Sequence, residues 1–399
     1  MMTSPEKDAR VGFVILITHF NMALYSTCFW IQNGVMPYLS KKLGMDAVMF
    51  GYLQTTFAIV QLLGGPLFGR FGDLFGGRAA LSLAYLSSSL TSLIMGLSTN
   101  VSLLFLSRLP SIFMHGMQAA QMVVTDLSLE SERTGELGKL GLSYGVGMII
   151  GSSAGGFLIS KFGESFAAYV AAAGSVLNSI VVMKYIPEDT KSVRQKNKPE
   201  MASSKSVFNV KKIIKLLSIP GAAEILVVKA ITGLPMGVFQ SMFSVVGMDY
   251  FKLEAEDNGY LMAYVGVLQM IMQGLVVGWL TKRLGEHTLL PWSILVISLV
   301  GLATALISNI FHFYLVCIPM SFGISGFYLT TNSILTKIVP PADTGAMLGL
   351  NMSVHSLIRS MAPTIGGFLY QLYGYPSFGY LQFTVNLLVF LYLFKRISN

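Results

Sequence analysis

The sequence predicts an all-α membrane protein with twelve transmembrane helices in two six-helix pseudo-repeats. Of its 399 residues, 53% are hydrophobic and only 12% are charged, whereas soluble domains carry about 25% charged residues. Apolar runs of roughly 20 residues, the length that crosses a bilayer, recur from end to end. Landmarks of the first half also return in order in the second half. We therefore expect lipid to surround most of the chain.

Glycine, proline and polar residues divide the apolar sequence into twelve predicted spans. In chain order these cover residues 11–39, 47–69, 78–98, 101–126, 135–162, 165–186, 220–250, 257–281, 288–309, 311–338, 344–372 and 376–394. The first run is too long for the apolar core of a signal peptide, which has about 7–15 residues. We expect this run to be retained as a span.

A long polar segment separates the sixth and seventh spans. We predict a bundle over residues 1–186, a basic cytoplasmic linker over 187–218, and a second bundle over 219–399. Residues 187–217 carry eight Lys or Arg against three acids. Bulky apolar and basic residues alternate over 207–217, as in an amphipathic helix on a membrane surface. A solvated linker is the alternative.

The distribution of basic residues predicts the orientation. If both termini and the linker lie on one side, 20 of the 27 Lys and Arg lie there. Basic residues near span ends stay on the cytoplasmic side, so we expect cytoplasmic termini in a plasma membrane, apical faces included, or an endomembrane. This topology accounts for the net charge of +8 without a nucleic-acid partner.

The repeat is visible as pairs of residues at a nearly constant offset of 208 to 211. These pairs are Gly51 and Gly259, Gly76 and Gly285, Pro110 and Pro319, Thr134 and Thr344, and Gly155 and Gly366. Each half has an even number of spans, so both copies cross the membrane in the same sense. Such halves can rock about a site between them, which is the geometry of alternating access.

The loop after the second span gathers glycines and charges in "GPLFGRFGDLFGGRA". It resembles the loop signature of the major facilitator superfamily at Gly69, Asp73, Gly76 and Arg78, with Leu74 and Gly77 as departures. The repeat copy keeps Gly278, Arg283 and Gly285, but has Lys282 in place of the aspartate. The resemblance implies that Asp73 docks on the start of the eleventh span near Thr344. An ordinary basic loop is the alternative.

A second signature lies in the fifth span. Its members are Gly147, Gly151, Ser152, Gly155 and Gly156. The spacing resembles the antiporter motif of drug/proton exchangers in the superfamily, with Ser152 in place of the usual proline. Glycine-mediated helix packing, without antiport, is the alternative.

Longer segments, among them "SRLPSIFMHGMQAAQMVVTDLS" and "APTIGGFLY", resemble the organic cation transporter-like branch of solute carrier family 22. The resemblance implies efflux of organic cations and amphiphilic drugs in exchange for protons. A proton gradient would supply the energy, with no other cofactor.

Polar side chains within the spans are the candidate substrate or proton pathway. At helical spacing they form stripes that we place around a central cavity. These candidates are His19, Asn21, Tyr25, Arg108, His115, Gln118, Lys229, Gln240, Tyr328, Asn332, Asn351, His355 and Arg359. Arg108, Lys229 and Arg359 each cost about 2.5–3.5 kcal/mol to insert, so a functional role is the default interpretation.

Charge within the spans argues against a cation as substrate. None of the 19 acids lies in the middle of a predicted span, and an unpaired basic cavity repels a cation. Histidines are then the groups that titrate near neutral pH. An anionic, zwitterionic or lipid-like solute bound by the arginines is therefore the alternative substrate.

A third hypothesis is a non-transporting membrane regulator that acts through protein partners at the linker or through lipid metabolism. The sequence has no nucleotide-binding loop, paired-cysteine metal motif or catalytic histidine motif. We expect a monomer that is not an enzyme, holds no metal and contacts lipids and a small-molecule substrate.

Overall fold

The computed structural model describes residues 4–128, 133–188, 190, 216–340 and 344–398. This part of the chain is helical and contains no strand. The helices are α1 (Ser4–Lys42), α2 (Ala47–Gly96), α3 (Val101–Leu106), η1 (Leu109–Phe113), α4 (Gly116–Leu127), α5 (Arg133–Phe162), α6 (Glu164–Tyr185), α9 (Ala222–Asp249), α10 (Ala255–Ile271), η2 (Met272–Val276), α11 (Val277–Leu284), α12 (Glu286–Leu306), α13 (Ile310–Ile338), α14 (Thr344–Tyr373) and α15 (Pro376–Ser398).

Within the described ranges, nine helices are long and apolar enough to cross a membrane. The prediction of twelve spans agrees with these helices, because α2 contains two spans and the nine helices do not include the fourth and eleventh spans. The second and third spans are merged in α2, which changes direction at Gly76, where φ is 84° and ψ is 171°. The fourth span consists of α3, η1 and α4, and α14 is the eleventh.

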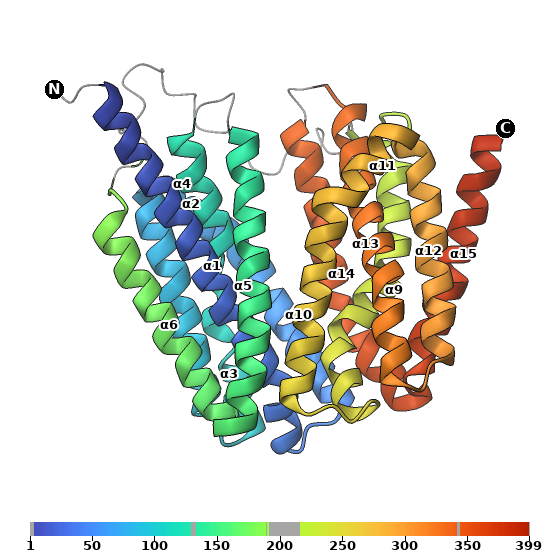
Figure 1. Ribbon diagram of the computed structural model, residues 1–399, viewed down its shortest axis with the longest axis horizontal. Coiled ribbons are helices and arrows are strands. Elements are labelled where there is room, and N and C mark those ends of the chain that lie inside the picture. Colours follow the sequence, from blue (N-terminus) through green and yellow to red (C-terminus); the bar gives the residue numbers. More distant parts are fainter. Residues whose placement is uncertain (1–3, 129–132, 189, 191–215, 341–343, 399) are drawn as a thin grey trace. The chain divides into compact units, whose positions relative to one another are not determined.

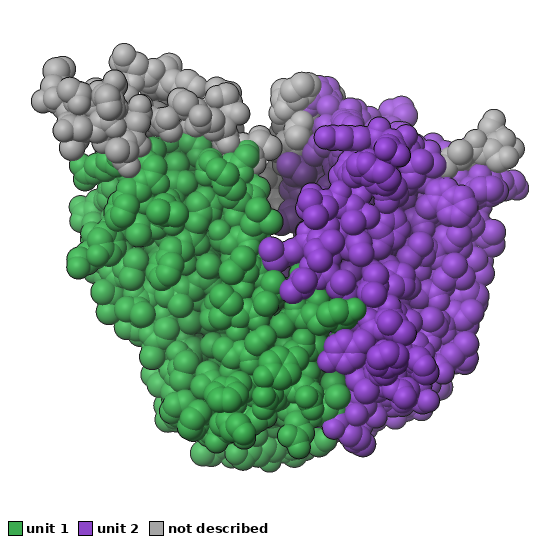
Figure 2. All heavy atoms as spheres, viewed as in Figure 1, with its two compact units in different colours: residues 1–45, 56–202, 253–266 green, residues 46–55, 203–252, 267–399 purple. Residues whose placement is uncertain are grey.

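The described chain packs into two compact units (Figure 2). Unit 1 contains residues 1–45, 56–202 and 253–266, and unit 2 contains residues 46–55, 203–252 and 267–399. Helix α2 therefore begins in unit 2, and α10 begins in unit 1. The predicted domain boundaries at residues 186 and 219 stay a prediction. Most of the linker, with nearly all of its predicted amphipathic helix, lies outside the described residues.

Backbone conformation reproduces the repeat that the sequence predicted. Positive φ angles occur at Gly44 (78°) and Lys252 (59°), at Gly76 (84°) and Gly285 (76°), and at Gly163 (87°) and Gly374 (72°). The two members of each pair are separated by the offsets of the sequence repeat. A positive φ is uncommon because it strains every residue except glycine. Its recurrence at paired positions shows that equivalent turns connect equivalent helices in the two halves.

In unit 2, the first turns of α2 pack closely against α14. A Cβ atom on Gly51 would collide with the carbonyl oxygen of Pro363, and one on Gly367 would collide with that of Ala47. The hydroxyl groups of Thr55 and Thr364 are 2.8 Å apart. Glycine allows the two backbones to touch here.

Unit 1 contains the equivalent contact between α10 and α5. A Cβ atom on Gly259 would collide with the carbonyl oxygen of Ser152, and one on Gly156 would collide with that of Ala255. Ser152 and Pro363 occupy equivalent repeat positions, as do Gly156 and Gly367. The same helix contact is therefore built twice, once in each unit.

Candidate functional site

In unit 1, Arg78 of the loop signature forms hydrogen bonds that connect the third span to the C-terminal end of α6. Arg78 donates from Nη1 to Oε1 of Glu188 at 3.1 Å and from Nη2 to the carbonyl oxygen of Met183 at 2.7 Å. Asp73 is exposed. Its expected docking near Thr344 would join the two units, so this interaction stays a prediction.

The repeat copy of the loop signature lies at the end of α11. Gly285 is the N-cap residue of α12, and the guanidinium carbon of Arg283 lies 4.2 Å from the centroid of the Trp279 ring. Gly278 has open space where a Cβ atom would lie. Arg283, which stands at the repeat position of Leu74, is thus held by a cation–π contact.

The antiporter-like glycines are in close helix contacts. Gly147, Gly151 and Gly155 lie against the backbone of α1, at Ala23, Thr27 and Ile31 respectively. The next helix face, with Ser152 and Gly156, lies against α10. Packing on two neighbouring helices explains the glycine spacing, and an antiport role for the motif stays a prediction.

The fourth span is not a continuous helix, which corrects the polar stripe expected from Arg108 to Gln118. A 3₁₀ turn over Leu109–Phe113 separates α3 from α4, and Pro110 stands at its start. Proline lacks the N–H that a continuous helix requires. Arg108 and His115 are therefore separated by irregular backbone, and helical spacing does not relate them.

Two neighbouring helices satisfy the backbone at this break. The Met114 carbonyl oxygen accepts hydrogen bonds from Tyr25 Oη of α1 at 3.2 Å and from Gln61 Nε2 of α2 at 3.1 Å. The rings of His115 and Phe68 are 5.2 Å apart. Among the predicted residues, Tyr25 and His115 thus meet at this break, and the Gln118 amide lies beside the loop-signature glycine Gly69.

Arg108 is almost fully buried, with 2% of its surface exposed. Its guanidinium donates to the sulfur atoms of Met36 at 3.1 Å and Met95 at 3.3 Å, and lies 5.7 Å from the centroid of the Phe57 ring. In the described chain, no carboxylate forms an ion pair with Arg108. Weak sulfur acceptors and an aromatic face hold this charge.

Five predicted residues come together in unit 2, where α9, α13 and α14 meet. We call them the Lys229 cluster; they are Lys229, Tyr328, Asn332, Asn351 and His355. Lys229, 3% exposed, donates from Nζ to Oδ1 of Asn332 at 2.9 Å, and this oxygen also accepts from Asn351 Nδ2 at 2.8 Å.

Aromatic rings form the second wall of the Lys229 cluster. Lys229 Nζ lies 5.4 Å from the centroid of the Tyr328 ring, and the rings of Tyr328 and His355 meet edge-on at 5.9 Å. Within the described residues, no acid forms an ion pair with Lys229.

Other predicted residues lie apart from this cluster. Gln240 and Arg359 have exposed side chains. Asn21 is fully buried in unit 1, and its backbone oxygen accepts from Asn178 Nδ2 at 2.9 Å. Sequence reasoning thus identified polar positions, but only part of them form one site.

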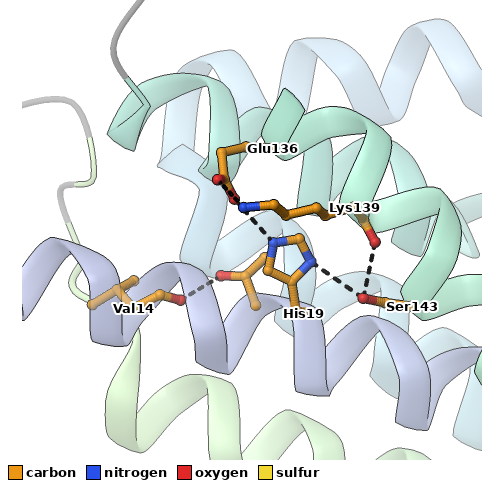
Figure 3. A network of polar contacts seen from close by, with 6 residues as sticks. Val14, His19, Glu136, Lys139 and Ser143 are labelled. Carbon is orange, nitrogen blue, oxygen red and sulfur yellow. Dashed lines mark hydrogen bonds and ion pairs between the residues drawn. The ribbon is translucent and has the colours of Figure 1, made fainter. Parts of the chain in front are cut away.

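His19, a predicted pathway residue, has polar neighbours that the sequence analysis did not name. His19 of α1 faces three residues in the first turns of α5, namely Glu136, Lys139 and Ser143 (Figure 3). Glu136 stands at the edge of the fifth span, 117 positions from His19. No local sequence pattern links residues at that separation.

The duplicated bundle and its glycine contacts define a two-repeat membrane transporter fold (Figure 1). The chain belongs to the Major Facilitator Superfamily, whose family model matches residues 18–363 and 231–398. Its family and fold are those of transporters and not of enzymes.

Curated relatives match nearly the whole chain. Solute carrier family 22 member 18 of Mus musculus is 46% identical over 96% of this chain and 96% of the relative. Solute carrier family 67 member A1 of Homo sapiens is 45% identical over 98% and 95%. Multidrug resistance protein 2 of Bacillus subtilis (strain 168) is 25% identical over 93% and 92%. The resemblance inferred from the sequence is confirmed.

Solved structures share the fold. A bacterial homologue of the human lysosomal transporter Spinster matches with a TM-score of 0.78 at 15% identity, over 98% of this chain and 96% of that one. The human organic anion transporter MFSD10 matches with a TM-score of 0.67 at 16% identity, over 97% and 99%.

Proposed function

We propose that this protein is a secondary transporter that moves organic anions or zwitterions by alternating access, and that the Lys229 cluster binds the acidic group. The observation that carries the proposal is the burial of Lys229 without an ion-pair partner in the described chain. A buried charge is costly unless it is paired. A solute carboxylate would supply the missing partner.

The cluster has unused hydrogen-bonding capacity for such a group. An ammonium group has three donors, and the bond to Asn332 uses one of them. Asn332 and Asn351 fix the ammonium in place, while Tyr328 and His355 offer aromatic surface to the rest of the solute. Charge and shape together favour an amphiphilic acid over a cation.

Ligand-induced thermal stabilisation of the detergent-purified protein tests this proposal. Benzoate and 1-naphthoate are the anionic probes, and tetraphenylphosphonium is the cationic probe. We expect the carboxylates to raise the Tm of the wild type and of Lys282→Met, an exposed control, but not that of Lys229→Met. A Tm raised by carboxylates equally in Lys229→Met would contradict the proposal.

Export of cationic drugs is the second candidate. It is favoured by the relatives named as multidrug resistance and tetracycline resistance proteins and by the carboxylate of Glu136 beside His19 in unit 1. Under this candidate, tetraphenylphosphonium raises the Tm and the carboxylates do not.

We further propose that protons drive transport by antiport, and that both termini face the cytoplasm. The basic residues concentrated on one side of the predicted topology support this orientation. Cysteines placed at residues 2 and 398 in a Cys28→Ala/Cys317→Ala background should react with a membrane-impermeant maleimide only after permeabilisation of cells. The monomeric state, a protein partner at the linker and a non-transporting regulatory role stay predictions.

A further inference from the structure

The group formed by His19, Glu136, Lys139 and Ser143, which we call the His19 site, lies in unit 1 where α1 packs along α5 (Figure 3). The Nε2 atom of His19 lies 3.4 Å from Oε2 of Glu136, and its Nδ1 atom lies 3.2 Å from Oγ of Ser143. The other carboxylate oxygen, Oε1, accepts from Lys139 Nζ at 2.7 Å. Both ring nitrogens of His19 therefore face a polar partner.

The hydroxyl group of Ser143 can donate its hydrogen bond to either of two acceptors. Its Oγ lies 3.2 Å from His19 Nδ1 and 3.1 Å from the carbonyl oxygen of Lys139. With neutral His19, Nε2–H donates to Glu136 and Nδ1 accepts from Ser143. With protonated His19, Nδ1–H donates to Ser143 Oγ, whose hydroxyl then donates to the Lys139 carbonyl oxygen. The site satisfies both protonation states, and the change between them is one proton and one hydroxyl rotation.

The ion pair between Lys139 and Glu136 keeps a negative charge next to the ring. The side chain of Glu136 is 19% exposed and that of His19 is 14% exposed, so the pair is shielded from solvent, whereas Lys139 is 61% exposed. The Coulomb attraction between protonated His19 and Glu136 is stronger in such a place than in water.

The other helices packed against α1 contribute their own charged groups. On the α4 side, Asp126 accepts from Thr190 Oγ1 at 2.6 Å. On α6, Lys184 Nζ lies 5.3 Å from the centroid of the Tyr185 ring. Within the described residues, Glu136 itself contacts Lys139 and His19.

We propose that His19 binds the proton that is exchanged for solute, with Glu136 as its counter-ion and Ser143 as the hydroxyl relay. The proposal rests on the transport function proposed above and names the group that carries its coupling ion. The proton binds at Nδ1 of neutral imidazole, no other bond is made or broken, and it leaves by the reverse step. The His19 site belongs to unit 1, and the Lys229 cluster belongs to unit 2.

Proton binding can be measured without any solute. In protein labelled with ¹⁵N-histidine and held in nanodiscs, the resonance lost in His19→Gln identifies His19. We expect this resonance to change from the neutral to the protonated form when the sample is acidified, and Glu136→Gln to need more acid for the same change, because it removes the counter-ion. A His19 resonance that keeps one form on acidification, or the same response in Glu136→Gln as in the wild type, would overturn the proposal.

Coupling is measured in proteoliposomes with labelled benzoate. We expect His19→Gln to keep benzoate exchange in the absence of a pH gradient but to lose accumulation driven by a gradient. His312→Gln, which changes an exposed histidine of α13, should behave as the wild type. Gradient-driven accumulation retained in His19→Gln overturns the proposal. Wild-type protein that neither binds nor exchanges benzoate overturns the anion-transport function instead, and the titration still decides whether His19 is a proton site.

Discussion

Lys229 of α9 and Asn332 of α13 share a hydrogen bond of 2.9 Å that fixes a buried ammonium group. Lys229→Met removes the charge and its desolvation cost, so we expect the free energy of unfolding to stay within about 1 kcal/mol of the wild type or to rise. Asn332→Leu keeps the charge and removes its acceptor, which should lower that free energy by about 1–3 kcal/mol. Thermal unfolding in detergent compares the stability of the two variants. A Lys229→Met variant less stable than Asn332→Leu would show that Lys229 has another strong partner.

The paired glycine contacts predict equal effects in the two units. Gly259→Ala and Gly51→Ala each place a methyl group against a backbone carbonyl of the neighbouring helix. We expect each variant to lose about 1–3 kcal/mol of unfolding free energy. Gly141→Ala is the matched control, because its Cβ atom meets open space and it should gain about 0.5–1 kcal/mol. Similar stability of all three variants would disprove the close packing.

Lys252 takes the positive φ that glycine takes at its repeat counterpart, Gly44. Left-handed backbone is strained for a lysine, so Lys252→Gly should raise the melting temperature by relieving about 1 kcal/mol of strain. Lys252→Ala is the control, since it shortens the side chain but keeps the strain. If Lys252→Gly and Lys252→Ala have the same melting temperature, Lys252 is not strained at this turn.

Tyr25 and Gln61 both satisfy the Met114 carbonyl at the break in the fourth span. Each single change, Tyr25→Phe or Gln61→Leu, leaves one donor and should cost about 0.5–1.5 kcal/mol. The double variant leaves a buried carbonyl without these donors, so its cost should exceed the sum of the two. Simple additivity would mean that the two bonds act independently.

The fold followed from sequence because its determinants are local or repeated. Apolar length predicts a span, and glycine, at Gly76 and Gly285, allows the backbone to turn with positive φ without strain. The Lys229 cluster was partly predictable for the same reason. Asn351 and His355 are spaced by four on α14 and therefore share a face.

Contacts between distant segments were not predictable in this way. The meeting of His19 with Glu136 depends on the packing of α1 on α5, and neither helix alone specifies its partner. The break in the fourth span did leave a signal in Pro110. A proline within an apolar run indicates a kinked or interrupted helix, and the regular stripe assumed through it was wrong.

The division of α2 and α10 between the units has a consequence for how the chain is synthesised and cut. Residues 253–266, which belong to unit 1, are encoded after the linker, while residues 46–55 of unit 2 are encoded long before it. When the ribosome has completed only the first six spans, part of unit 1 has therefore not been synthesised. The α5 surface around Gly156 then lacks the α10 residues that pack against it. Fragments separated at the linker should each be incomplete alone and should recover their missing turns only when both are present in the same bilayer.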